Sequence, residues 1–266
     1  MIPQPHPDLE QITLDDPSSH IYELHSTAPS SDLGILQRTP TLSLTINDTD
    51  YKFTQSISSL NKDGSTTGFA MWKISIPFVK WLIKSPLYDL HGKYIMELGA
   101  GVTGLFSCIL GKVCDRYVAT DQSHLLKLLK SNIVDNVRDV ESSTIDGIVK
   151  QRKVIKGKID VVEFDWEEPD QGWYNLKEVC GDVKPDFVIG CDIVYNDYLV
   201  EHLVESLERV VGESTIVLIG LQVRLPENME LFVETLLQHN FKVFLHTPEV
   251  LTDELSSGYA IYYITR

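Results

Sequence analysis

The sequence contains no long hydrophobic run. No stretch of its 266 residues approaches the ~20 consecutive apolar residues that a membrane-spanning helix needs. The first residues, MIPQPHPDLEQ, also lack the basic start and the apolar centre of a secretory signal. We therefore expect a cytoplasmic protein with no membrane partner.

Cysteine is scarce and shows no pattern of chemistry. The four cysteines, Cys108, Cys114, Cys180 and Cys191, form no CxxC pair and have no histidines at zinc-like spacing. Small buried thiols in a reducing compartment are the simpler interpretation. The sequence thus predicts no metal site.

Basic residues are also few. Lys and Arg total 23 against 38 Asp and Glu, which gives a net charge of −15. Such a surface repels the phosphates of nucleic acid, and the one short basic run, KQRKVIKGK at 150–158, is better interpreted as a solvated loop. We expect no direct nucleic-acid binding and a basic protein as partner.

Length and composition favour one sizeable α/β core, expected to be monomeric, with a small appendage. Residues 1–40 form an acidic, proline-containing arm, whose first 20 or so residues we expect to be extended or partly disordered. Through residue 50 there are eight acids against the single base Arg38, so the arm is a candidate for recruiting a basic substrate. Residues 41–266 are expected to form a single domain that begins with a β-hairpin over 41–57.

The chain is organised around residues 93–104, KYIMELGAGVTG. A short apolar strand runs into Glu97 and then into a turn that carries Gly99, Gly101 and Gly104. Glycines let a backbone turn tightly and approach a ligand, and the helix expected next presents free N–H groups. This predicts a nucleotide-like cofactor over the turn. GAGVTG also satisfies the dinucleotide pattern GxGxxG, so the turn alone leaves the cofactor open.

The rest of the chain alternates strands with helices. Strands are predicted over 116–121, 159–166, 186–192, 214–221, 241–246 and 259–264, and helices over 77–85, 125–133, 173–179, 197–211 and 226–239. A polar insertion, 135–158, interrupts the alternation. The pattern predicts a mostly parallel sheet with helices on both faces, whose last two strands, joined without a helix, pair antiparallel.

Candidate binding residues lie where these strands end, because ligands of open α/β sheets bind at the carboxyl edge. Asp121 is placed to accept hydrogen bonds from ribose hydroxyls, although a strand-end Asp can instead cap the next helix. S-adenosylmethionine needs such a carboxylate, a flat apolar surface and a lid, which Asp121, Trp166 and Trp72 can supply. The eight histidines form no dehydrogenase-like constellation, so a methyltransferase is favoured over an NAD-dependent oxidoreductase.

Five segments carry a family resemblance. GFAMW, ELGAGVTG, ATD, FDW and GCDIVY, in this order over roughly residues 55–195, resemble the seven-β-strand class I methyltransferases, and within them the lysine methyltransferases marked by a DxxY motif. The resemblance implies a Rossmann-like sheet of seven strands with S-adenosylmethionine as cofactor. It also implies a protein substrate, with a large-subunit ribosomal protein the leading class.

The resemblance further implies roles for individual residues. Trp72 would close over the methionine part of the cofactor, Asp121 would hold the ribose, and Trp166 would flank the adenine. The remaining cofactor-binding candidates are the strand end, the turn and a small side chain after the fourth strand: Glu97, Gly99, Ala100, Gly101 and Cys191.

Asp192 and Tyr195, the ends of the motif DIVY, are the predicted reaction centre. The Asp192 carboxylate would orient a lysine amine, and Tyr195, one turn later, would wall the lysine channel. The alternative is that Asp192 caps the following helix and Tyr195 packs in its first turn. Ile193 and Val194 stand where methylases of planar nitrogens carry Pro-Pro, which favours an aliphatic amine.

The sequence therefore predicts an S-adenosylmethionine-dependent protein-lysine N-methyltransferase. A translation elongation factor or a chaperone is the second substrate class. An NAD-dependent oxidoreductase and a cofactor-binding interaction module without catalysis are the alternatives from other classes.

Overall fold

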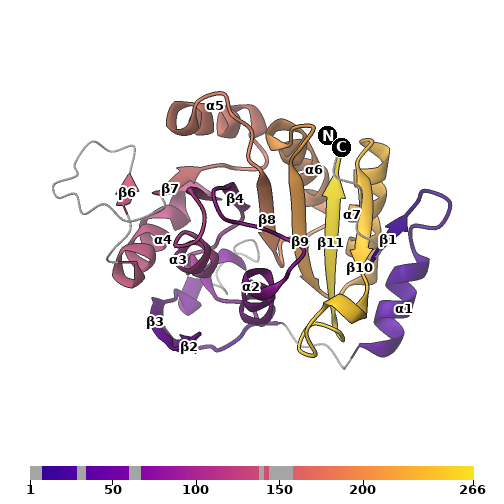
Figure 1. Ribbon diagram of the computed structural model, residues 1–266, viewed down its shortest axis with the longest axis horizontal. Coiled ribbons are helices and arrows are strands. Elements are labelled where there is room, and N and C mark those ends of the chain that lie inside the picture. The colour runs from indigo at the N-terminus through magenta and orange to yellow at the C-terminus, as the bar shows by residue number, and fades with distance from the viewer. Residues whose placement is uncertain (1–7, 29–33, 60–66, 138–140, 144–157) are drawn as a thin grey trace.

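The computed structural model describes residues 8–28, 34–59, 67–137, 141–143 and 158–266. A nine-stranded sheet forms the centre of this part of the chain, in the order β1-β10-β11-β9-β8-β4-β5-β7-β6 (Figure 1). The strands are β1 (Leu9–Ile12), β4 (Tyr94–Leu98), β5 (Arg116–Asp121), β6 (Glu141–Ser143), β7 (Lys158–Glu163), β8 (Phe187–Cys191), β9 (Ile216–Gln222), β10 (Lys242–His246) and β11 (Tyr259–Thr265).

The sheet confirms the predicted fold class. Neighbouring strands from β9 to β6 pair parallel, whereas β11 pairs antiparallel with both β9 and β10. The central strands are apolar runs, as parallel strands covered on both faces require; all five residues of β8 are buried. Two strands add to the expected seven, β1 at one edge and β6 at the other.

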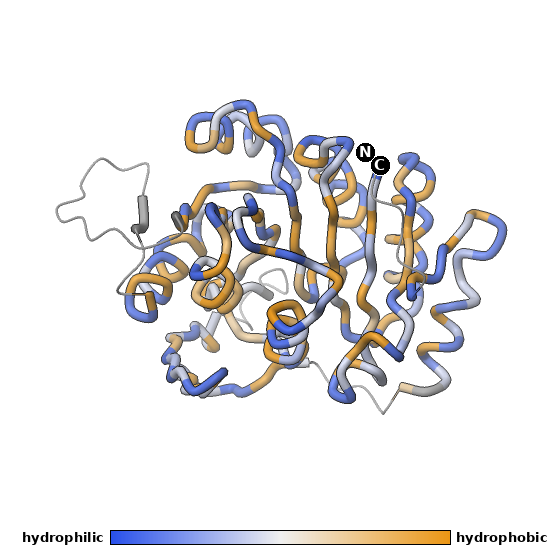
Figure 2. The backbone as a smooth tube through the Cα atoms, in the orientation of Figure 1, coloured by the Kyte–Doolittle hydropathy of each residue, from blue (hydrophilic) through white to orange (hydrophobic). Residues whose placement is uncertain are grey.

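Helices cover both faces of the sheet. One apolar core lies under α2 (Ser75–Lys84), α3 (Leu105–Leu110) and α4 (Ser123–Asn136), and a second lies under α1 (Ser19–Thr27), α5 (Pro169–Cys180), α6 (Tyr198–Val210) and α7 (Pro226–Gln238). Short 3-10 turns occupy Ile57–Ser59, Thr67–Phe69 and Pro248–Val250. Figure 2 shows hydrophobic residues along the central strands and polar residues in many of the connecting loops. No helix of the described residues is long and apolar enough to cross a membrane.

The predicted N-terminal hairpin is present as β2 (Thr41–Ile46) and β3 (Thr49–Thr54). Asn47 and Asp48 form its two-residue turn with φ of 48° and 59°, the left-handed conformation that a type I′ turn needs and that Asn and Asp tolerate. Leu42, Ile46 and Phe53 are buried against the first core.

A buried asparagine ties this hairpin to the glycine turn. Asn132 of α4 accepts from the backbone N–H of Thr54 at 2.8 Å and donates to the carbonyls of Thr54 and Val102 at 2.9 and 2.6 Å. One amide thus satisfies backbone groups of two segments, which positions the turn relative to the hairpin.

Residues 8–20 differ from the expectation of an extended or partly disordered start of the arm, of which residues 1–7 lie outside the described residues. β1 pairs with β10, and Ile35 forms a β-bridge with Trp72. Helix α1 buries His20 and Ile21, and His20 Nε2 lies 3.1 Å from the Tyr262 hydroxyl. The physical reason is that β10 would otherwise be an open edge, whose backbone groups accept another strand.

The polar insertion 135–158 is only partly described. Its first residues end α4, residues 141–143 form β6, and Lys158 begins β7. The remainder, with most of the basic run 150–158, lies outside the described residues. All four cysteines are free thiols. Three of them are buried and Cys180 is half-buried, in line with the expectation of small buried thiols.

Candidate active site

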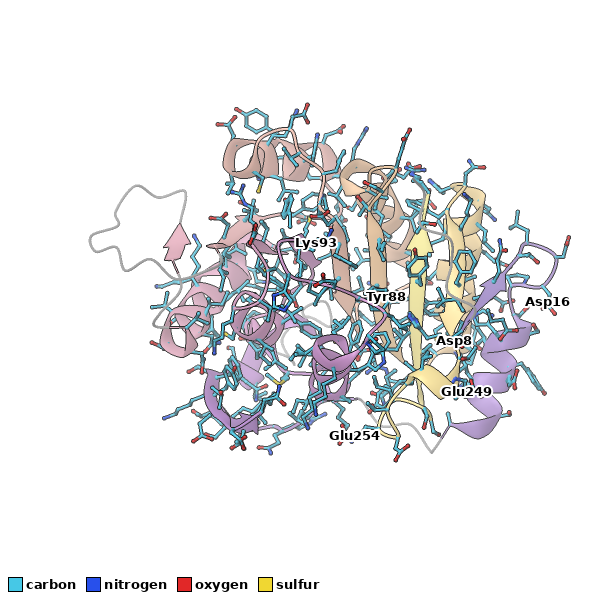
Figure 3. All side chains as sticks on the ribbon, in the orientation of Figure 1. Asp8, Asp16, Tyr88, Lys93, Glu249 and Glu254 are labelled. Atoms are coloured by element: carbon cyan, nitrogen blue, oxygen red, sulfur yellow. The ribbon has the colours of Figure 1, made fainter. Side chains whose placement is uncertain are left out.

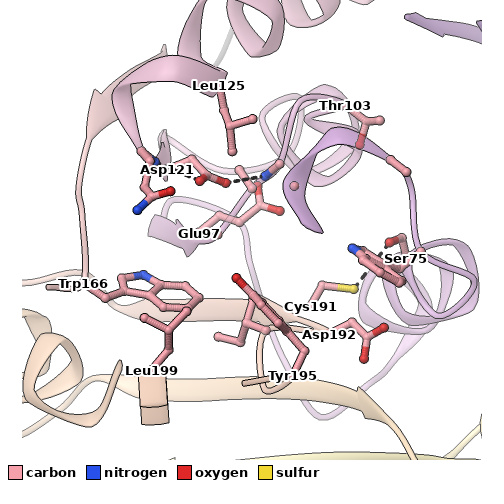
Figure 4. Close-up of a pocket in the computed structure, with 18 of the residues that line it drawn as sticks. Ser75, Glu97, Thr103, Asp121, Leu125, Trp166, Cys191, Asp192, Tyr195 and Leu199 are labelled. Carbon is pink, nitrogen blue, oxygen red and sulfur yellow. Dashed lines mark hydrogen bonds between the residues drawn. The ribbon is translucent and has the colours of Figure 1, made fainter. Parts of the chain in front are cut away.

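A pocket of about 250 Å³ opens where β4, β5 and β8 end. Figure 4 shows Glu97 and Asp121 across from Trp166, Tyr195 and Asp192. All ten predicted site residues line this one pocket: Trp72, Glu97, Gly99, Ala100, Gly101, Asp121, Trp166, Cys191, Asp192 and Tyr195. The rule that ligands bind at the carboxyl edge of the sheet therefore locates the pocket from sequence.

The glycine turn has a backbone that only glycine adopts readily. Gly99, Gly101 and Gly104 have φ of 68°, 61° and 61°, in the left-handed region. A Cβ on Gly101 would also lie 3.0 Å from the carbonyl oxygen of Gly68. The turn is thus shaped by close approach of two backbone segments beside the pocket.

Three amides of the turn already have acceptors within the protein. Ala100 N–H donates to Thr120 O at 3.0 Å and Val102 N–H to Gly68 O at 2.8 Å. Gly101 N–H donates to Asp121 Oδ2 at 2.7 Å. Because α3 is only six residues long and these amides are bonded internally, the turn offers shape rather than an anion site.

Asp121 links the end of β5 to the glycine turn. Its Oδ2 accepts from Gly101 N–H at 2.7 Å, and its Oδ1 accepts from Gln122 N–H at 2.8 Å. It does not act as the N-cap of α4, which is Gln122. Burial raises the pKa of Asp121 to about 6. Each oxygen of a carboxylate can accept more than one hydrogen bond, so Asp121 retains acceptor capacity for hydroxyl donors in the pocket.

Glu97 is the most deeply buried carboxyl group at the turn. It is 2% exposed, and its Oε2 accepts from the Tyr117 hydroxyl at 2.7 Å. Burial raises the pKa of Glu97 to about 8. At neutral pH this group is therefore largely protonated, unlike Asp121.

Two tryptophans supply flat surfaces. A Cβ on Gly99 would lie 3.1 Å from Trp166 Cζ2, so the Trp166 indole lies directly beside the turn. Trp72 is held by its bridge to Ile35, and the Arg224 guanidinium lies 5.2 Å from the centre of its ring. Both indoles line the pocket. They offer two flat surfaces, against which a nucleoside and a group attached to it can pack.

Cys191 carries a neutral thiol next to Asp192. It is 8% exposed, and its Sγ lies 3.5 Å from Ser75 Oγ. Burial raises the pKa of this thiol well above its usual range. A protonated thiol is a poor nucleophile, so Cys191 contributes a small surface rather than covalent chemistry.

Asp192 has a positive φ angle, and the two oxygens of its carboxylate have different surroundings. Its φ is 57°, and its N–H donates to Gly220 O at 2.7 Å. Oδ1 accepts from Gln222 N–H at 3.2 Å and from Arg224 Nη2 at 2.8 Å. Oδ2 is buried and has no hydrogen-bond partner among the described residues. Burial raises the pKa of Asp192, and the Arg224 guanidinium opposes that rise.

The helix-cap alternative for the DIVY motif is wrong. Helix α6 begins at Tyr198, and its N-cap is Asp197, whose side chain accepts from Tyr198 N–H at 2.8 Å. Residues 193–196 are not helical. Tyr195 is therefore not one helical turn after Asp192, and instead reaches the pocket, half-buried, from an irregular segment.

Sequence reasoning missed several residues of the site. Gln222 and Arg224 contact Asp192 from the end of β9, which the carboxyl-edge rule would have included. Tyr198 and Glu167 also line the pocket, and the Tyr198 hydroxyl donates to Glu167 Oε1 at 2.9 Å. No sequence signal links these last two residues, because they come from different connections.

The described residues contain no group of three or more His, Cys, Asp or Glu arranged to hold a metal ion. What the pocket combines is a tight turn, a carboxylate with spare acceptor capacity, two indoles and a second, buried carboxylate oxygen that lacks a donor. Such an arrangement can hold a nucleoside-like molecule at one end and an N–H donor at the other.

Comparisons with known proteins agree with this geometry. A family model described as lysine methyltransferase matches residues 52–239. Proteins named ribosomal lysine N-methyltransferase 5 are similar over most of the chain. The one from Lachancea thermotolerans is 28% identical, with 81% of each chain covered, and the one from Kluyveromyces lactis is 28% identical, with 85% of this chain and 90% of the relative covered.

Two solved structures share the fold. One is described as a SAM-dependent methyltransferase from Streptococcus mutans, with a TM-score of 0.50, 12% identity and 86% of this chain covered. The other is described as a methyltransferase complexed with SAH, with a TM-score of 0.52, 10% identity and 85% covered. This chain spans 56% of the length of each.

Proposed function

The chain belongs to the lysine methyltransferase family, and on this premise we propose how its pocket performs the reaction. S-adenosylmethionine lies over the glycine turn, and the amine of a substrate lysine reaches Asp192. The observation that carries the proposal is the presence, in one pocket, of the turn with Asp121 and of the buried, unpartnered oxygen Asp192 Oδ2.

The residues present fit this cofactor. Asp121 has acceptor capacity for the ribose hydroxyls, and Trp166 presents a flat surface beside Gly99 for the adenine. Trp72 lines the pocket toward Arg224 and Asp192, where the methionine part would lie. The backbone of Gly99, Ala100 and Gly101 allows close approach, and Glu97 and Cys191 complete the walls.

The chain's own residues orient the amine rather than activate it chemically. When bound, S-adenosylmethionine supplies the methyl group: the nitrogen lone pair forms the N–C bond while the C–S bond breaks and leaves its electron pair on sulfur. Asp192 Oδ2 accepts one N–H of the neutral amine, which leaves the lone pair free to be aimed. Tyr195 walls the channel. Such positioning accounts for a large part of many enzymatic accelerations.

The substrate class that we propose is a large-subunit ribosomal protein. The relatives named above support it, as does the net charge of −15, which complements a basic protein. An elongation factor or a chaperone is the second class. Action on ribosomal protein is consistent with a cytoplasmic location, and we expect a monomer.

The test is to incubate the purified protein with labelled S-adenosylmethionine and lysate from cells whose gene for it is deleted, and to locate the mark by mass spectrometry. We expect a methylated lysine in a ribosomal protein. Asp192→Ala should lower the labelling rate by about 100-fold or more through lost orientation. The same variant should still bind adenosylhomocysteine, followed by tryptophan quenching.

An unchanged labelling rate in Asp192→Ala would show that the reaction centre lies elsewhere. Cofactor binding by the wild type with no transfer to any protein would support the interaction module. Quenching by NADH in place of adenosylhomocysteine would contradict the choice of cofactor.

A further inference from the structure

We propose that Arg224 is a positioning residue of the methyl transfer, which fixes Asp192 so that Oδ2 alone faces the amine. This inference rests on the proposed role of Asp192. It links the DIVY motif to Arg224, which lies after β9, and to the segment of the N-terminal arm around Gly34, which packs against Arg224.

The geometry assigns different tasks to the two oxygens of Asp192. Arg224 Nη2 and the Gln222 N–H both donate to Oδ1, at 2.8 and 3.2 Å. The main chain of Asp192 is anchored too, through its N–H to Gly220 O at 2.7 Å. With two donors on one oxygen and the backbone held, the carboxylate cannot rotate freely. Oδ2 is thereby presented as the acceptor that still lacks a donor.

Arg224 is itself held in place by neighbours from two other segments. Its side chain is 15% exposed and lies over the ring of Trp72. A Cβ added at Gly34, whose φ is 72°, would lie 2.4 Å from Arg224 Nη1 and 2.3 Å from Gln222 Oε1. The Gly34 carbonyl accepts from Lys73 N–H at 2.7 Å, and Ile35 bridges Trp72. The arm therefore closes the reaction centre from behind.

The charge of Arg224 suits the chemistry of an amine nucleophile. Asp192 without a counter-charge would be a buried carboxyl group that favours its protonated form and loses acceptor capacity. Paired with Arg224, it remains an acceptor while the pair carries no net charge. A neutral pair does not hold the incoming lysine as its ammonium form, which has no lone pair to react.

The experiment compares Arg224→Met, which keeps bulk and removes charge, with Arg224→Lys, which keeps charge. Methyl acceptors are large ribosomal subunits from gene-deleted cells, or whole lysate if the subunits are not methylated. We expect Arg224→Met to lower kcat on the order of 100-fold. KM and the affinity for adenosylhomocysteine should change by less than about threefold, because Arg224 is not proposed to touch either ligand. Arg224→Lys should recover most of the loss.

A second variant tests the same inference without altering Arg224. Gly34→Ala should displace the guanidinium and lower kcat in the same way. Its matched control is Gly181→Ala, at the same φ of 72° but with nothing within 4 Å of the added Cβ, so this variant carries the backbone strain alone. Thermal unfolding of both reports any general loss of structure.

The outcomes separate the inference from the function on which it rests. Wild type that methylates no lysine in either acceptor contradicts the proposed function. Active wild type with an unchanged kcat in Arg224→Met overturns the positioning role alone. Equal losses in Arg224→Met and Arg224→Lys, or equal losses in Gly34→Ala and Gly181→Ala, also overturn it, because packing or strain would then explain the effect.

Discussion

Three carboxyl groups of the pocket differ in protonation and in hydrogen bonding because their surroundings differ. Glu97 is buried against Tyr117, and its pKa of about 8 leaves it largely protonated near neutrality. Asp121, whose pKa is about 6, is ionised there and is held by two backbone N–H groups. Asp192 combines a guanidinium partner with a buried oxygen that has none among the described residues. Of these three groups, Asp192 has a buried oxygen that no donor of the described residues reaches, which suits it to accept an N–H from a substrate.

Asp121 should control cofactor affinity. Asp121→Ala removes an acceptor for the ribose hydroxyls and for Gly101 N–H, so we expect adenosylhomocysteine to bind about 10- to 100-fold more weakly, since hydrogen bonds to charged groups are worth about 1.5–3 kcal/mol. Tryptophan quenching measures this. The matched control is Glu163→Ala, because Glu163 is the exposed β7 partner of Asp121 and does not line the pocket.

The same residue predicts a pH dependence. Because the pKa of Asp121 in the folded protein is about 6, the carboxylate is lost as pH falls through this value. Wild-type affinity for adenosylhomocysteine should decline below about pH 6, while Asp121→Asn should lack this step. Equal pH profiles for the two proteins would mean that Asp121 does not contact the ribose as a carboxylate.

The candidate site was predictable where the sequence rule and the chemistry coincide. Nine of the ten predicted residues line the pocket because strand ends of a parallel sheet meet at one edge, and because the turn and the DIVY motif are contiguous in sequence. The tenth, Trp72, lies before β4 and was indicated by the family resemblance. Arg224 and Gly34 were not predicted as partners of this site. Arg224 could have been included by applying the carboxyl-edge rule to β9, whereas the approach of Gly34 to Arg224 depends on how the N-terminal arm packs, which no spacing in the sequence encodes.

Helices and strands could be predicted where the signal is local in sequence, and were missed where they depend on contacts between distant segments. The hairpin of β2 and β3 was predictable because its alternation and its Asn47-Asp48 turn are adjacent. β1 and α1 were not, because four prolines obscure a short apolar pattern whose partner is β10, more than 200 residues away. Whether such a segment is ordered depends on an open sheet edge elsewhere in the chain.

The docking of α1 should depend on pH through His20. Burial lowers the pKa of this imidazole to about 4, although Asp16 and Glu230 act to raise it. In the unfolded chain the imidazole has its usual pKa of 6.5, so it takes up a proton there at a higher pH than in the folded protein. The free energy of unfolding of the wild type should therefore fall as pH drops below 6.5, and this fall should be complete near pH 4. The gap between 6.5 and about 4 corresponds to about 3 kcal/mol.

His20→Gln removes this loss. Urea unfolding should find the two proteins similar at pH 7.5, whereas at pH 4.5 the variant should gain about 2 kcal/mol relative to wild type. His25→Gln is the control, on the exposed side of the same helix. A constant difference between His20→Gln and wild type across pH would show that His20 is not buried in its neutral form.

For the molecule as a whole, the distribution of charge matters more than its total. The acids of the arm, such as Asp8 and Asp16, lie beside β1 and α1 at the edge of the molecule (Figure 3). Four strands separate β1 from β4, which carries the glycine turn. Exposed acids closer to the pocket are Glu167, which lines it, and Asp197, which lies between the lining residues Asn196 and Tyr198. This placement favours the pocket mouth over the arm as the surface that attracts a basic substrate.

Paired charge removals should distinguish these two surfaces. Glu167→Gln with Asp197→Asn keeps the acceptor for Tyr198 and the cap of α6, yet should raise KM for the methyl acceptor about two- to fivefold at low salt. The matched pair Glu10→Gln with Asp15→Asn on the arm should change KM less. Both differences should shrink above about 0.3 M salt, where screening acts within a few ångströms. A larger effect from the arm pair would instead assign recruitment to the arm, so that it would serve both to hold Arg224 and to gather the substrate.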